Sequence, residues 1–181
     1  TNVLHALSHG ARQVVVVTSA GPREGASTTA AGLARVLALS GHRVVLVGGD
    51  LRSPSAVGAP GAPGLAEVLV GAARLSQVLV EGEVPGLELL PAGDMPGNPS
   101  ELLGGRNMSD LLHHLAADRI VIIDAPPVCR FTDAVVLAEY AGGVLLVARA
   151  GRTSAEELRE AALAVGQARR GVFQYAGLAF L

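Results

Sequence analysis

Short apolar runs recur along this chain, and each is apolar throughout instead of alternating with polar residues. A strand of this kind is covered on both faces, which is typical of a parallel sheet. Segments with helical spacing separate the runs, and this order predicts right-handed crossover helices. We therefore expect an α/β protein, a three-layer α/β/α sandwich with a mostly parallel sheet. The strands are predicted at residues 13–18, 43–47, 87–91, 120–124 and 143–149, with a last one within 175–181.

Between the strands, helices are predicted at residues 28–40, 100–117, 132–140 and 153–169. Gly, Pro and Ala dominate residues 53–64, which predicts a surface loop. Residues 93–103 form a second irregular stretch, in which Ser100 is the expected N-cap of the following helix. No repeat or linker is visible, so residues 1–181 are expected to form a single domain. Because the chain begins with Thr1 and not Met, we expect it to be a piece of a longer protein.

Composition limits the partners. The net charge of -2 argues against a nucleic-acid partner, because such proteins usually carry a basic surface. All basic side chains are arginine, so a missing lysine at any position has to be weighed against this bias. The single cysteine, Cys129, fits a reducing compartment and is expected in the core. No run approaches the roughly 18 apolar residues of a membrane span, and no signal peptide is visible.

The turn after the first predicted strand reads AGPREGAST, residues 20–28, and leads into a helix. Its backbone N–H groups could bind an anion, with Gly25 allowing a close approach. Ser27 and Thr28 would offer hydroxyl groups, one to a metal ion and one to a phosphate. This pattern is that of a P-loop, but Ala26 stands where a P-loop carries its lysine. An ordinary strand–helix turn capped by Ser27 is the alternative.

Carboxylates follow two further strands, and ligands of such sheets bind at the carboxyl ends of the strands. Asp124 could hold Mg²⁺ through water, or it could simply order its loop. Asp50 could contact a metal ion or polarise a nucleophile, or it could be a turn aspartate paired with Arg52. The adjacent His113 and His114 point about 100° apart on a helix, so we expect them in solvent and not as a metal pair.

Taken in order, the motifs of this chain resemble the cytoplasmic P-loop domain of bacterial tyrosine kinases, the BY-kinases. These kinases partner polysaccharide co-polymerases in capsule and exopolysaccharide export. The resemblance covers nearly the whole chain and implies a P-loop NTPase-like fold. The related partition and division-site ATPases lack the NPSELL stretch. The motifs are TSAGPREGASTTAAGLA, VVLVGGDLRSP, PAGDMPGNPSELL, IVIIDAPPV with TDAVVLA, and GVLLVARAGRT.

The resemblance also implies a site. Magnesium with ATP or ADP would be the cofactor. A membrane polysaccharide co-polymerase or an adaptor would be the partner, with a possible homo-oligomer, at the cytoplasmic face of the membrane. By position, nucleotide would be bound by Pro22, Glu24, Gly25, Ala26, Ser27, Thr28 and Arg52. The metal ligands would be Ser27, Asp50 and Asp124, of which Asp50 and Asp124 would be catalytic.

Two departures from the family pattern decide what we expect of the activity. Ala26 replaces the phosphate-binding lysine, and Gly48 replaces the first aspartate of the second Walker motif. Losing one charge-assisted hydrogen bond, worth roughly 1.5–3 kcal/mol, weakens nucleotide binding by about 10- to 100-fold. Cations aimed at the transferred phosphoryl group contribute about 10³–10⁵ in rate. Turnover should therefore be very low, and two losses together favour natural decay over an introduced alanine.

The leading hypothesis is thus a degenerate BY-kinase-like domain, a regulatory or assembly module with weak or no ATP turnover. A second hypothesis is an active tyrosine (auto)kinase in which Arg23 or Arg52 supplies the missing cation. A third is an interaction scaffold that binds no nucleotide.

Overall fold

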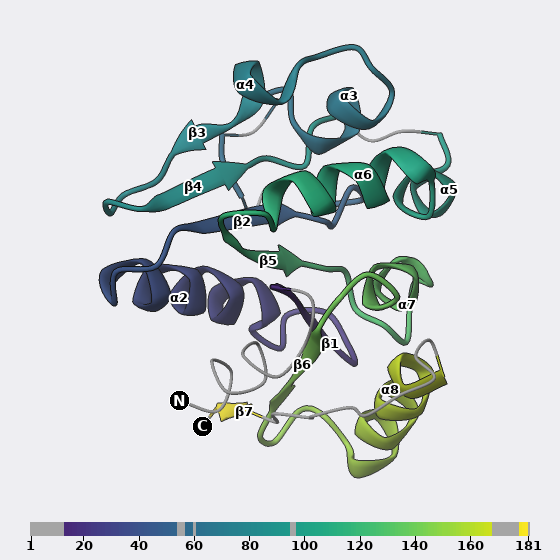
Figure 1. The fold of residues 1–181 in the computed structure, drawn as a ribbon. Coiled ribbons are helices and arrows are strands. Elements are labelled where there is room, and N and C mark those ends of the chain that lie inside the picture. Colours follow the sequence, from purple (N-terminus) through teal and green to yellow (C-terminus); the bar gives the residue numbers. More distant parts are fainter. Residues whose placement is uncertain (1–12, 54–56, 60, 95–96, 168–177, 181) are drawn as a thin grey trace.

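The computed structural model describes residues 13–53, 57–59, 61–94, 97–167 and 178–180. Within these residues a seven-stranded sheet has the order β3-β4-β2-β5-β1-β6-β7 (Figure 1). Neighbouring strands are parallel except for β3 and β4, so the predicted mostly parallel sheet is confirmed. The strands are β1 (Val14–Ser19), β2 (Val44–Gly48), β3 (Val80–Glu81), β4 (Leu87–Leu90), β5 (Ile120–Asp124), β6 (Gly143–Arg149) and β7 (Leu178–Phe180).

Helices cover both faces of the sheet, which confirms the three layers (Figure 1). Alternate residues of β1 illustrate this: Val15 and Val17 pack toward α2, whereas Val14 and Val16 belong to the apolar cluster on the other face. The continuous apolar runs are explained by this double coverage. The helices are α2 (Ala26–Leu39), α3 (Leu65–Leu69), α4 (Leu75–Val78), α5 (Pro99–Leu103), α6 (Arg106–Leu115), α7 (Asp133–Ala138) and α8 (Ala155–Gln167).

The predicted single helix over residues 100–117 is wrong, because α5 and α6 are separate helices. Gly104 and Gly105 lie between them, and glycine pays a large entropic cost inside a helix. The expected N-cap is also wrong: Asn98 occupies that position, Pro99 begins α5, and Ser100 lies inside the first turn. The side chain of Ser100 is consequently available for contacts elsewhere.

Several smaller predictions have clear outcomes. Cys129 is exposed, so its expected burial is wrong. His113 and His114 are exposed on α6, as predicted. The short elements α3, α4 and β3 were not predicted. Residues 168–169 of the last predicted helix, and residues 175–177 and 181 of the last strand, lie outside the described residues. In the part that the structure describes, no helix has the length and apolarity to cross a membrane.

Candidate functional site

The carboxyl ends of β1, β2 and β5 meet at one edge of the sheet. Val17 in β1 and Gly48 in β2 both stand opposite Asp124, the last residue of β5. The turn after β1 and the loop after β2 therefore begin beside Asp124. The predicted adjacency of these three strand ends is confirmed, and their role as one ligand site stays a prediction.

The turn between β1 and α2 is held by its own side chains. Glu24 is almost fully buried and accepts a hydrogen bond from the backbone N–H of Gly21 at 3.1 Å. Gly25 precedes α2 with a φ of 98°, a left-handed conformation that glycine adopts without strain. No side chain caps this helix, so the alternative of a Ser27 cap is wrong. The first N–H groups of α2 remain available to an anion.

Ala26, at the position of the missing lysine, is the first residue of α2. Its side chain is 9% exposed and belongs to the apolar cluster between α2 and the sheet. A methyl group packed in this way contributes no charge to the turn. Any positive charge near a bound phosphate therefore has to come from another residue.

Asp50 lies near enough to Asp124 at this edge for its charge to act on the carboxyl group of Asp124. Asp124 is 3% exposed, and burial raises its pKa to about 6; the charge of Asp50 adds to this rise and a hydrogen bond from Ser27 opposes it. Burial also raises the pKa of Asp50, which accepts backbone N–H groups of Arg52 and Ser53, both at 3.1 Å.

These groups fit a magnesium ion. Carboxylate and hydroxyl oxygens are the ligands that Mg²⁺ prefers, and it keeps several waters, so few protein ligands suffice. Asp50, Asp124 and the hydroxyl of Ser27 would supply them. No cluster of three or more His, Cys, Asp or Glu side chains that could hold a metal ion occurs among the described residues.

Gly48 is closed in by the segment after β4. A Cβ atom at residue 48 would lie 2.8 Å from the backbone nitrogen of Ala92 and 3.2 Å from its Cβ. Backbone contacts this short cannot be relieved by turning a flexible side chain. A side chain at residue 48 would therefore require the Ala92 segment to shift.

Arg52 does not make the predicted turn ion pair with Asp50, because its guanidinium points to Asp133. Nε of Arg52 lies 2.7 Å from Oδ2 of Asp133, and Nη2 lies 3.2 Å from Oδ1. Nη2 also donates to the hydroxyl of Ser100 at 3.3 Å, and the guanidinium lies 4.6 Å from the ring centre of Phe131. These contacts occupy the cation that was expected to reach nucleotide.

Two residues near the site were missed by sequence reasoning. Asp133 is fully buried at the start of α7, and its only signal was an acidic residue in the first turn of a predicted helix. Arg149, at the end of β6, donates from Nη1 to the backbone carbonyl of Arg23 at 3.4 Å. Arg149 is thus a cation beside the turn that the sequence hypotheses did not consider.

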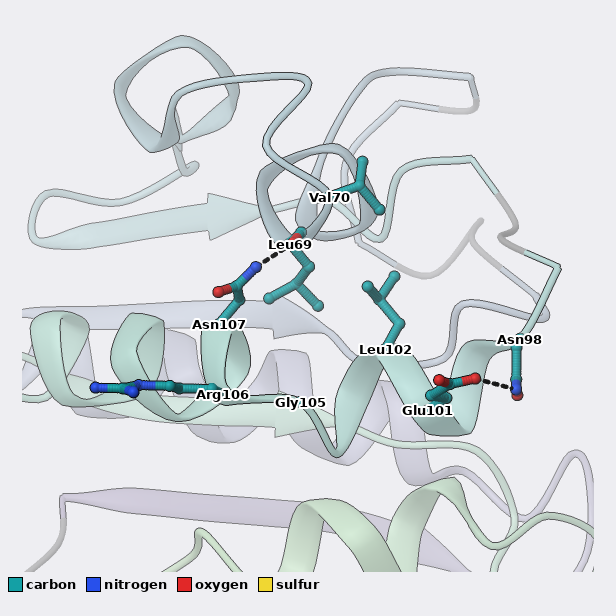
Figure 2. A pocket seen from close by; sticks show the side chains of 8 residues that line it. All are labelled: Leu69, Val70, Asn98, Glu101, Leu102, Gly105, Arg106 and Asn107. Atoms are coloured by element: carbon teal, nitrogen blue, oxygen red, sulfur yellow. Dashed lines mark hydrogen bonds between the residues drawn. The ribbon is translucent and has the colours of Figure 1, made fainter.

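A cavity of about 450 Å³ lies elsewhere, between α3 and the α5–α6 segment (Figure 2). Leu69 and Leu102 line it, and Glu101 and Asn107 stand at its sides. Neither the turn after β1 nor Asp50 or Asp124 belongs to its lining. The site described above is therefore separate from this cavity.

A mostly parallel sheet between two helical layers, with a glycine turn and carboxylates at the carboxyl ends of its strands, is the architecture of P-loop NTPase-like folds. No family model matches the chain. The tyrosine-protein kinase YwqD of Bacillus subtilis is 37% identical over 165 residues, which are 89% of this chain and 70% of that relative. The putative tyrosine-protein kinase EpsB of Ralstonia nicotianae is 38% identical over 164 residues. The chain belongs to the family of bacterial tyrosine-protein kinases.

Solved structures agree with this assignment. The kinase domain of the Escherichia coli tyrosine kinase ETK has a TM-score of 0.85 at 30% identity, covering 97% of this chain and 72% of that one. The BceF tyrosine kinase domain has a TM-score of 0.84 at 34% identity, covering 97% and 73%. Some relatives are much longer: the matched region is 88% of this chain but 22% of EpsB.

Proposed function

We propose that this chain is a degenerate kinase-like domain that binds magnesium nucleotide weakly, turns ATP over slowly or not at all, and serves as a regulatory or assembly module. The observation that carries the proposal is the pair of altered positions at the site. Ala26 packs into the apolar cluster beneath α2, and Gly48 leaves no room for a side chain next to Ala92. One position lacks the ammonium group and the other lacks the carboxylate.

The residues that remain support weak binding. Free N–H groups at the start of α2 and the hydroxyl of Thr28 would contact phosphate. Ser27, Asp50 and Asp124 would hold Mg²⁺, which supplies positive charge to the phosphate oxygens when it is bound. Glu24 keeps the turn in shape by accepting a hydrogen bond from the backbone N–H of Gly21.

Calorimetric titration with ADP and ATP, each with Mg²⁺, tests the proposal. Without the lysine, affinity should be about 10- to 100-fold weaker than that of a relative measured in parallel, since a charge-assisted hydrogen bond is lost. Affinity equal to that of the relative, together with phosphotransfer, would overturn the proposal. Absence of any binding at millimolar nucleotide would favour the nucleotide-free scaffold.

Arg149 favours a second candidate function, an active kinase with an arginine as its phosphate-binding cation. Its contact with the carbonyl of Arg23 brings a guanidinium to the turn, whereas Arg52 is occupied by Asp133. Under this hypothesis, labelling from radioactive γ-phosphate is rapid in the wild type and is lost in Arg149→Ala. Under the leading proposal, the wild type itself incorporates almost no label.

The wider setting is proposed from the family. We infer that residues 1–181 are one domain of a longer protein in bacterial capsule or exopolysaccharide synthesis and export, which relatives such as EpsB, longer than this chain, support. A membrane polysaccharide co-polymerase or adaptor would hold the domain at the cytoplasmic face of the membrane, where copies could form a homo-oligomer. Co-purification of the full-length protein with membranes, lost when that partner is deleted, tests this setting.

A further inference from the structure

Three segments that are far apart in the sequence meet around one guanidinium group. Arg52 follows β2, Ser100 lies in α5, and Asp133 begins α7. Ser100 donates a hydrogen bond to the carboxylate of Asp133, and Arg52 donates to both of them. With Phe131, over which the guanidinium lies, these residues are called the Arg52 clamp.

Burial makes this clamp a strong constraint. Asp133 is 0% exposed, and Arg52 is 30% exposed. A buried carboxylate without a partner is very costly, so Asp133 holds Arg52 in place as long as the domain is folded. Two donors on one carboxylate also fix the direction of the planar guanidinium.

The backbone of the same arginine holds the carboxylate of Asp50. The N–H groups of Arg52 and Ser53 each donate to Oδ1 of Asp50 at 3.1 Å. A movement of Arg52 would therefore break the contacts that hold the carboxylate of Asp50. The side chain of Arg52 belongs to the clamp, whereas its backbone N–H holds Asp50. A displacement of the clamp would therefore also displace Asp50.

We propose that Asp133 is a positioning residue, which through Arg52 fixes the loop that presents Asp50 to the magnesium position. Asp133 itself touches neither metal nor nucleotide. The part of this inference that concerns magnesium rests on the proposed function, whereas the coupling between Asp133 and the Asp50 loop does not. The second Walker motif, the NPSELL stretch and the TDA segment each contribute one residue to the clamp.

The test compares Asp133→Asn with Asp110→Asn. Asp110 also pairs with an arginine, Arg106, but the pair is on the surface of α6, with side chains 69% and 91% exposed. Asparagine has nearly the shape of aspartate, so the variant removes the charge without opening a cavity. In both variants, amide hydrogen exchange of Arg52 and Ser53 is measured by NMR without nucleotide, and Mg²⁺ is then titrated at fixed ADP.

In Asp133→Asn, exchange at Arg52 and Ser53 should rise by about tenfold relative to other amides of similar protection, because a charge-assisted contact is lost. The Mg²⁺ concentration needed to support ADP binding should rise, whereas ADP binding without Mg²⁺ should not change. Asp110→Asn should change neither quantity. If Asp133 had a purely structural role, its substitution would raise exchange throughout the domain. ADP binding with Mg²⁺ and ADP binding without Mg²⁺ would then change together.

If Asp133→Asn fails to fold, Ser100→Ala removes the hydroxyl that contacts both Arg52 and Asp133 while the ion pair stays, and a smaller rise in exchange at Arg52 and Ser53 is expected. Unchanged exchange at these amides in a folded variant would overturn the inference. If the wild type binds no ADP at all, the proposed function fails, and the exchange data still decide whether Asp133 controls the Asp50 loop.

Discussion

Gly48 and Ala92 pack so closely that a side chain at residue 48 would meet the backbone of the neighbouring segment. A Cβ atom there would lie 2.8 Å from the Ala92 nitrogen. The end of β2 is thus packed to fit glycine at residue 48. Restoring the carboxylate by a single substitution would require the Ala92 segment to move.

Gly48→Ala should destabilise the domain by about 1–3 kcal/mol, the usual cost of overpacking a core. Gly143→Ala is the matched control, because a Cβ atom at residue 143 meets nothing within 4 Å. Urea denaturation of the two variants measures the difference. Equal stability of both would show that the Ala92 segment yields easily and that Gly48 is not required by packing.

Ala26→Lys should strengthen the binding of magnesium ADP by about 10- to 100-fold, because the new ammonium group can contact phosphate. The long side chain can leave the apolar cluster at the helix start and extend toward the turn. Ala31→Lys, on the exposed side of α2, adds the same charge away from the turn. A similar gain in both variants would mean that only net charge matters, contrary to the local role assigned to residue 26.

Asp124→Asn should stabilise the metal-free domain at pH 8. The folded pKa of Asp124, about 6, lies above the ordinary value of 3.8, so ionisation costs stability as pH rises through that interval. Stability is expected to fall between about pH 4 and 6 and then level off, by up to about 3 kcal/mol for this group. The pKa of Asp50 is also raised, so its ionisation likewise lowers the stability of the folded domain as pH rises.

Denaturation with urea at pH 4 and pH 8, without divalent metal, measures this effect. The two proteins should differ least at pH 4, where Asp124 is neutral in the folded state and only partly ionised in the unfolded state, and most at pH 8. A variant less stable than the wild type at pH 8 would contradict the burial argument. The wild type should bind Mg²⁺ more tightly above pH 6 than below it. The Asp124→Asn variant should bind Mg²⁺ much more weakly than the wild type.

Sequence reasoning predicted the elements that follow from local residue patterns or from hydrophobic periodicity. The buried runs predicted every long strand, and parallel strands ending at one edge predicted that Asp50 and Asp124 would be neighbours. Sequence reasoning missed the contacts that depend on long-range packing. Asp133, the partner of Arg52, is 81 residues away in the sequence, and its burial results from tertiary packing. Cys129 has the type of a core residue, but its position after β5 leaves it exposed.

Arg149→Ala should weaken residual nucleotide binding by about 2- to 5-fold, the range for an exposed charge contact. Its guanidinium reaches the carbonyl of Arg23 in the phosphate turn, although its side chain remains exposed. Arg152→Ala removes an exposed arginine from the next turn and should have no effect. Calorimetry in low and high salt measures both, and the effect of Arg149 should shrink as salt screens the charge. A loss of 100-fold or more, with rapid γ-phosphate labelling of the wild type, would instead make Arg149 the working substitute for the lysine. It would thereby support the active-kinase hypothesis over the degenerate one.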